Sequence, residues 1–313
     1  MVGGSLFILQ APKSPFIVRG GFIRWWGSRM IDMGNAAVSR RQWLGSLALG
    51  VVAAGSSLSL PEADAATRCD LPDLADPEAS LRNIVRMQGS LLEQDVPWWF
   101  TGIVFAVRGD NEAPRPIVRF EGMEIYWFSH RPNGYQLGGH TVTFFRDVET
   151  NEYLRQFRNP WTGRLDEVRP AVQGGNLGFS YSREGIWPVR LDGTPISEPR
   201  RTPLKLQWHS IGDHVWLQHQ TVYPPGMPPM HGQRQSLFVR RQDFLDSRLS
   251  ALPTTFSSTV FMGWLKWMNM TGEPGHVIWH ASGAKLRSRD ELPREYRERA
   301  EREYPERMTA KPR

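Results

Sequence analysis

The sequence predicts a mainly β protein whose antiparallel strands close into a barrel or a two-layer sandwich, with a few peripheral helices. β-Rich stretches follow one another from residue 98 onward, and short turns separate most of them. One stretch, residues 141–147, alternates between two faces, with Val142 and Phe144 on the same face. About ten such strands in one domain favour closure into a barrel.

The elements follow in order along the chain. Asp76 caps a short helix that has Pro77 at its first position, and an apolar stripe runs from Leu81 to Leu92. The predicted strands cover residues 98–107, 117–130, 141–147, 153–158, 177–182, 186–190, 204–210, 214–223, 235–241 and 276–281.

Helical pieces are predicted at residues 242–249 and 259–270. The second is rich in aromatic residues and methionine, which suits either a lid over the barrel mouth or a packing helix. A C-terminal helix follows, capped by Ser288 or Asp290, with an apolar face that includes Tyr296. Such a helix covers an edge or one end of a sheet.

The N-terminal part resembles a twin-arginine (Tat) export signal. Arg40 and Arg41 precede a charge-free run over residues 42–61, and a small-x-small site follows at residues 63–65. The alternatives are a membrane anchor and a buried helix, but small and hydroxylated residues dilute the apolar run.

Two domain assignments follow from the signal. Residues 1–65 form an N-terminal extension with the Tat-type signal, and residues 66–313 form a single β-barrel domain with the C-terminal helix. The true start is either Met1 or Met33. We expect a periplasmic protein that uses the Tat export machinery and keeps no stable membrane span after processing.

Charge and cysteine content exclude several classes of function. The chain carries +6 in all, but residues 1–65 contain much of the excess, and no lysine- or arginine-rich block remains after them. Nucleic acid is therefore not an expected partner. Cys69 is the only cysteine, so intramolecular disulfides, cysteine-ligated clusters and c-type haem are excluded. We expect no cofactor.

The eight histidines all lie between His130 and His280. Histidines from neighbouring strands can bind a divalent metal, and the weaker hypothesis is a metal enzyme that uses the following set: His209, His219, His276 and His280. Their spacing is not diagnostic, because an odd separation places His214 and His219 on opposite faces of one strand.

A metal-free site is easier to build from this sequence. His219 shares a strand face with Val215 and Leu217, and beside Tyr126 or Arg155 from earlier strands it can act as a general acid or base. The alternative is a histidine hydrogen-bonded within the core. No phosphate-binding glycine loop, no G-x-S-x-G and no H-E-x-x-H are present.

Large aromatic side chains are the expected lining of a ligand cavity, although each also fits an ordinary core. The segment Asn159-Pro160-Trp161-Thr162-Gly163 reads as a turn that forms either a structural corner or a rim contact. The predicted ligand-binding residues are Trp127, Phe145, Asn159, Trp161, Trp208 and Trp216.

Several short motifs resemble an exported bacterial family. They are the arginine pair, residues 159–163, and a C-terminal part with Gly283-Ala284-Lys285-Leu286, Leu292-Pro293 and Tyr304-Pro305. The family is known only as domain of unknown function 1838. The resemblance implies an antiparallel, barrel-like fold of the calycin type, and it transfers no catalytic residues.

The sequence leaves two main hypotheses about function. The first is a cofactor-free lyase, isomerase or hydratase that acts on a small apolar or aromatic molecule inside the barrel, with His219, Tyr126 and Arg155 as catalytic groups. The second is a non-catalytic periplasmic carrier of a hydrophobic ligand, as in lipocalin-type barrels.

Overall fold

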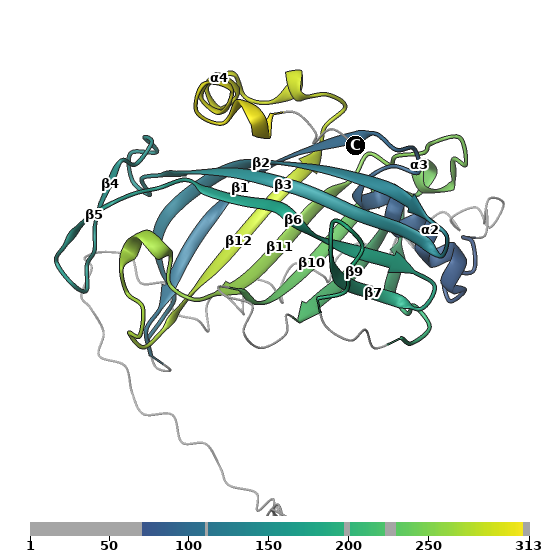
Figure 1. Cartoon of the computed structure of the whole chain (residues 1–313), viewed down its shortest axis with the longest axis horizontal. Coiled ribbons are helices and arrows are strands. Elements are labelled where there is room, and N and C mark those ends of the chain that lie inside the picture. The colour runs from purple at the N-terminus through teal and green to yellow at the C-terminus, as the bar shows by residue number, and fades with distance from the viewer. Residues whose placement is uncertain (1–70, 110–111, 197–200, 223–229, 309–313) are drawn as a thin grey trace, which may run out of the picture. The chain divides into compact units, whose positions relative to one another are not determined.

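The computed structural model describes residues 71–109, 112–196, 201–222 and 230–308 (Figure 1). The predicted signal over residues 1–65 lies outside the described residues. The predicted mainly β, antiparallel fold is confirmed by a ten-stranded sheet and a small two-stranded sheet. The strands are β1 (Asp95–Val107), β2 (Arg115–Arg131), β3 (Gly134–Arg146), β4 (Gln156–Arg158), β5 (Leu165–Glu167), β6 (Ala171–Ser182), β7 (Gly185–Arg190), β8 (Gln207–Ile211), β9 (His214–Val222), β10 (Met230–Arg240), β11 (Thr255–Met262) and β12 (His276–Lys285).

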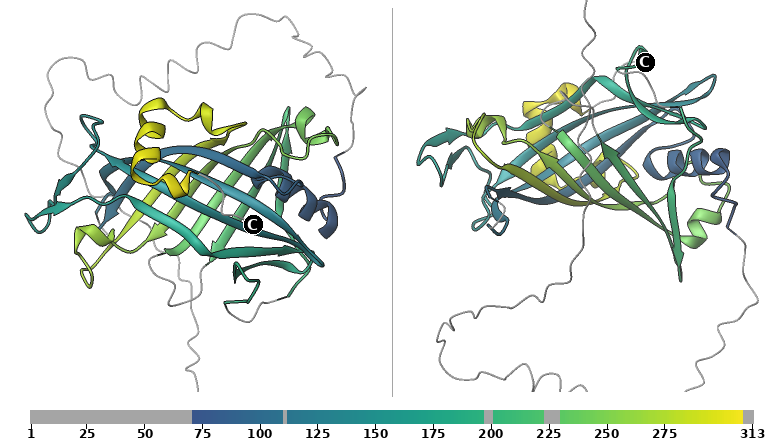
Figure 2. Two further views of the ribbon diagram at one scale, coloured as in Figure 1. Left: turned by 45° about the horizontal axis from the view of Figure 1, so that its top comes forward. Right: turned by 90° about the horizontal axis from the view of Figure 1, so that it is seen from below.

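The large sheet runs in the order β7-β6-β3-β2-β1-β12-β11-β10-β9-β8. β1 and β12 are the first and last strands along the chain, and they pair with each other at the centre of the sheet. Their register runs from Trp98↔Lys285 to Val107↔His276. The sheet curls into a half-barrel (Figures 1 and 2), and in the described residues the edge strands β7 and β8 do not pair with each other. The sheet is therefore open where a closed barrel was predicted.

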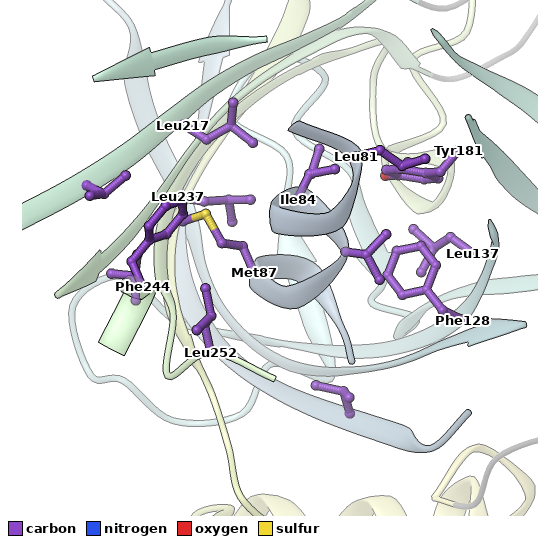
Figure 3. Close-up of a cluster of buried hydrophobic side chains, with 14 of the residues drawn as sticks. Leu81, Ile84, Met87, Phe128, Leu137, Tyr181, Leu217, Leu237, Phe244 and Leu252 are labelled. Atoms are coloured by element: carbon purple, nitrogen blue, oxygen red, sulfur yellow. The ribbon is translucent and has the colours of Figure 1, made fainter. Parts of the chain in front are cut away.

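The helix α2 (Pro77–Gln88) lies inside the curve of the sheet. Asp76 caps it as predicted, because its carboxylate accepts a hydrogen bond from the N–H of Ala79 at 3.0 Å. The apolar side chains of α2 pack between the two halves of the sheet (Figure 3). A helix is about 10 Å across, so α2 holds the halves apart and explains the open seam. The surrounding strand residues are Leu217 and Leu237 on one side, and Phe128, Leu137 and Tyr181 on the other.

Polar side chains from the sheet fix the position of α2. The indole N–H of Trp98 donates to the carbonyl of Gln88 at 2.9 Å, and the hydroxyl of Tyr181 donates to the side chain of Gln88 at 2.6 Å. From the β8 edge, the indole N–H of Trp208 donates to the hydroxyl of Ser80 at 2.8 Å. Strands from both halves of the sheet thus hold one helix.

A second apolar cluster fills the other end of the concave face. Phe145 lies at its centre, with ring centroids 5.6 Å from Trp267 and 5.5 Å from Trp279. Trp267 and Met268 belong to the 3₁₀ turn η2 (Lys266–Met268), which folds over these strands. The expected aromatic-lined hollow is consequently packed at both ends, by α2 at one and by this cluster at the other.

The convex face of β2 and β3 is covered by the helix α4 (Arg294–Glu303). Tyr296 and Ala300 are fully buried against Met123, Val142 and Phe144. The C-terminal helix was expected to cover an edge or one end of a sheet, and it instead covers the face of two interior strands. Its predicted cap is also wrong: Ser288 caps the preceding 3₁₀ turn η3 (Arg289–Glu291), and Pro293 occupies the cap position of α4.

The helix predicted over residues 259–270 is wrong. Residues Thr255–Met262 form β11, which pairs with β10 on one side and β12 on the other, so its backbone groups are satisfied by two neighbours. The alternating Thr259 and Val260 suit a strand. The other predicted piece, 242–249, shortens to the helix α3 (Arg241–Leu245).

Among the described residues, no helix combines the length and the apolar character needed to span a membrane.

Candidate functional site

The concave face is half-exposed between α2 and the second cluster, and polar side chains gather there. Cross-strand partners point to the same side of a sheet, so the register assigns each residue to a face. Trp98 contacts α2 and pairs with Glu124, which therefore lies on the concave face. Leu217 contacts α2, and His219, two residues further along β9, faces the same way.

The first group, here called the carboxyl wall, consists of Glu124, Tyr126 and Thr141 on β2 and β3. All three are partly buried. The carboxyl of Glu124 accepts a hydrogen bond from the hydroxyl of Thr141 at 3.2 Å and another from Tyr126. In the described part of the chain no cation pairs with Glu124, whose charge is balanced only by these hydroxyls.

The environment of Glu124 changes its acidity. Burial raises the pKa of its carboxyl to about 7, and the hydrogen bonds from Tyr126 and Thr141 oppose this shift only partly. A carboxyl with such a pKa is partly protonated at neutral pH, so it can both accept and donate a proton.

The second group, here called the amide wall, consists of His219, Gln233, Gln235 and Ser258 on β9, β10 and β11. His219 pairs with Gln235, which pairs with Ser258. The amide of Gln233 donates to the hydroxyl of Ser258 at 3.0 Å. Gln233, Gln235 and Ser258 are polar and carry no charge.

His219 has no hydrogen-bond, ionic or ring partner among the described residues, although it is half-buried. Burial alone lowers the pKa of its imidazole, so the ring is neutral at neutral pH. The alternative of a histidine hydrogen-bonded within the core is therefore not what the structure shows. An unpaired imidazole on a concave face is available to a ligand.

The two walls face each other across the curve of the sheet. At the level of α2 they are separated by the helix itself, with Leu217 and Leu237 on one side and Phe128 on the other (Figure 3). His219 and Gln235 lie two residues beyond those leucines. Glu124 lies four residues beyond Phe128, in the same direction.

The structure brings together only some of the predicted site residues. Tyr126 and His219 face the same concave surface but stand on opposite walls. Phe145 and Trp208 also face inward, where Phe145 is core of the second cluster and Trp208 packs against α2. Arg155 is exposed beside β4, outside the large sheet, so it does not join Tyr126.

Two predicted ligand-binding residues lie on the convex face. Trp127 is buried there with its ring centroid 5.7 Å from His140. Trp216 lies between the inward-facing Val215 and Leu217, so it faces outward, where it stacks on His209 at 5.1 Å. Neither can contact a molecule on the concave side, because both side chains point to the convex side of the sheet.

Asn159 and Trp161 form a structural corner at the end of the sheet. Asn159 is fully buried, and its side-chain oxygen accepts from the N–H of Trp161 at 3.0 Å while its amide donates to the carbonyl of Met268 at 3.3 Å. Trp161 packs on Trp264 with ring centroids 5.4 Å apart. These contacts favour the structural reading of this turn.

The histidines of the weaker metal hypothesis do not converge. His219 faces inward, whereas His209 faces outward. His276 and His280 are also outward, because they flank the inward-facing Val277 and Trp279 on β12. Among the described residues, no group of three or more histidine, cysteine, aspartate or glutamate side chains is placed to hold a metal.

Sequence reasoning missed Glu124. Both faces of β2 carry apolar side chains, so alternation alone does not show which face is concave. The available signal was the spacing of two residues that places the Glu124 carboxylate on the same strand face as Tyr126 and Phe128, a face that is otherwise largely apolar. Gln235 was missed for a similar reason.

Two surface clefts lie elsewhere. One of about 170 Å³ is lined by residues that include Asp95, Ile125 and Ser288, and the other, of about 580 Å³, lies beside Asp76 and Arg201. Neither is lined by residues of the carboxyl wall or the amide wall.

The family model for a protein of unknown function, DUF1838, matches residues 93–172 and 231–313. The match covers more than half of the chain, so the protein belongs to this family. The two segments contain β1 to β3 and nearly all of β10 to β12, which are neighbours in the sheet in the order β3-β2-β1-β12-β11-β10. No curated protein and no solved structure matches the chain.

Proposed function

We propose that the concave face of this DUF1838 protein binds a small, largely apolar molecule and that Glu124 acts on it as a general acid and base. The observation that carries the proposal is a partly buried carboxyl on the inner side of a curled sheet, hydrogen-bonded to two hydroxyls and without a cation among the described residues. The aromatic and aliphatic residues of both clusters supply apolar surroundings for the body of a ligand.

The chemistry suits an isomerase, lyase or hydratase. The Glu124 carboxylate removes a proton from a carbon next to a carbonyl group, and the electron pair moves to the carbonyl oxygen. As Glu124 takes up this proton, the Tyr126 hydroxyl turns from the carboxyl and donates to that oxygen. The protonated carboxyl then returns the proton to another carbon or to a leaving group. These steps need neither a redox cofactor nor a metal.

The test starts with native mass spectrometry of the purified protein to identify a co-purifying small molecule. With that molecule as substrate, Glu124→Gln should reduce turnover by 10²-fold or more, on the order expected for a general base, while leaving its binding within a few-fold. Glu301→Gln, an exposed carboxylate on α4, is the control. Unchanged turnover in the Glu124 variant contradicts the catalytic role.

A carrier is the second candidate function. The neutral imidazole of His219, which has no partner in the described ranges, and the amides of the amide wall favour binding without chemistry. In that case the co-purifying molecule leaves the protein unchanged, and Glu124→Gln alters only its affinity.

We also propose that the protein is exported, because an arginine pair precedes a charge-free run. A calycin-type relationship is a second part of this hypothesis, and its support is the curled antiparallel sheet. Replacing Arg40 and Arg41 by lysine should trap the protein in the cytoplasm. Cell fractionation measures this, and secretion of the variant at the normal level contradicts the proposal.

A further inference from the structure

We propose that His219 determines which ligand the site accepts, by hydrogen bonding to an uncharged polar group at one end of an apolar molecule. This inference rests on the proposed function and adds the class of ligand and the residue that selects it. The selecting residue lies on the amide wall, opposite the carboxyl wall where the chemistry is proposed.

The first support is the unsatisfied state of the imidazole. His219 is half-buried on β9, where Gln235 of β10 is its neighbour, yet none of the described residues donates to it or accepts from it. A polar group that loses water on folding normally gains a partner in the protein. A ligand group that donates to or accepts from the ring supplies this partner.

The second support is the absence of charge around it. The concave residues described on β9, β10 and β11 near His219 are Leu217, Leu237, Gln235, Ser258 and Val260, none of them charged. A carboxylate or phosphate ligand would need a cation here. Amide, hydroxyl and carbonyl groups of a neutral ligand match the available donors and acceptors.

The third support is the position of His219 in the family. The matched segments include Glu124, Tyr126 and Thr141, but residues 173–230, which contain His219, lie outside them. In the sheet this unmatched stretch provides most of β6 and all of β7, β8 and β9, which are the two strands at each open edge. The carboxyl wall thus lies within the matched segments, as do Gln235 and Ser258 of the amide wall, whereas His219 lies outside them.

The helix α2 sets a scale for the ligand. It packs against side chains of both halves of the sheet, and a helix is about 10 Å across. We therefore choose probes with a planar apolar body of about this length and one hydrogen-bonding end.

Three probes with the same body test the inference: trans-cinnamamide, trans-cinnamate and trans-β-methylstyrene. Calorimetric titration of the purified protein should show the neutral amide binding about tenfold more tightly than the hydrocarbon, the worth of one hydrogen bond, and the anion binding weakest. His219→Leu should remove the preference for the amide and leave the hydrocarbon unchanged. His219→Gln, which keeps a hydrogen-bonding group, should restore part of it.

Controls separate this inference from the proposed function. His209→Leu, an outward-facing histidine on β8, should change nothing. Ala281→Trp, which fills the half-exposed middle of the concave face beside Gly102, should abolish binding of all probes. If it does not, the proposed site itself is wrong. If it does, but His219→Leu keeps the amide preference, only the selection by His219 is wrong. Binding of none of the probes, or tightest binding of cinnamate, overturns the ligand class.

Discussion

The hydroxyl of Tyr296 on α4 accepts a hydrogen bond from the backbone N–H of Met123 at 2.9 Å, and it also donates to the carbonyl of Val142 at 2.7 Å. Met123 and Val142 are partners across β2 and β3. One side-chain hydroxyl thus joins the C-terminal helix to the backbone of two strands. Burial raises the pKa of this hydroxyl, which keeps its proton for the bond to Val142.

Replacing Tyr296 by phenylalanine should lower the free energy of unfolding by about 1–3 kcal/mol, because a buried N–H and a buried carbonyl both lose their partner. Urea denaturation measures the effect. Tyr304→Phe is the matched control, since the hydroxyl of Tyr304 has no hydrogen-bond partner among the described residues. Equal stability of the two variants contradicts the role assigned to the Tyr296 hydroxyl.

Glu124 should make the protein less stable as pH rises from 4.5 to 7. Its pKa is raised from 4.5 to about 7 in the folded state, so in this window the unfolded chain binds fewer protons at this site than the folded one. The contribution is fully present below pH 4.5, and its loss by pH 7 amounts to at most about 3 kcal/mol.

The measurement for Glu124 is the difference in unfolding free energy between wild type and Glu124→Gln across this pH range. The glutamine variant should lack this part of the pH dependence, whereas Glu301→Gln should retain it. Parallel curves for wild type and Glu124→Gln would show that the carboxyl is not desolvated.

Lys285 should stabilise the end of α2. Its ammonium donates to the carbonyls of Arg86 and Gly89, both at 2.8 Å. Lys285→Met keeps the apolar stem but removes both bonds, so we expect a loss of about 1–3 kcal/mol and faster amide exchange in α2. Lys266→Met on the exposed side of η2 is the control. Unchanged exchange in α2 would contradict the anchoring role.

Asp76 should contribute about 1 kcal/mol through its cap of α2. Asp76→Ala loses this contribution, and Asp76→Asn retains most of it, because the amide oxygen can accept the same hydrogen bond from Ala79. Thermal unfolding of the two variants compares them directly. If asparagine is as harmful as alanine, the charge of Asp76 matters more than its hydrogen bond.

Local patterns were sufficient to predict α2 and most strands. Asp76 followed by Pro77 marks a helix start whatever the surroundings, and alternation over residues 141–147 marks a strand. Local patterns failed at Thr259, where closely spaced aromatic and methionine residues gave a false helix signal. The strand conformation of β11 depends on pairing with β10 and β12, and this pairing is not visible in the local sequence.

The site was less predictable than the fold. His219 and Leu217 were correctly placed on one face because strand periodicity is strict. That this face is the inner one depends on α2, which enters the curve of the sheet from a distant part of the sequence. For the same reason neither the inward position of Glu124 nor the outward position of Trp216 follows from the sequence alone.

The pairing of β1 with β12 has a consequence for biosynthesis. β1 is the first strand of the sheet to leave the ribosome, and it stays without one of its two neighbours until nearly the whole chain has been made. Contacts between residues so distant in sequence form slowly, and an unpaired strand edge is prone to aggregation in the meantime. Nascent chains of this protein therefore need protection until synthesis ends, and a truncated chain that stops before β12 should be insoluble.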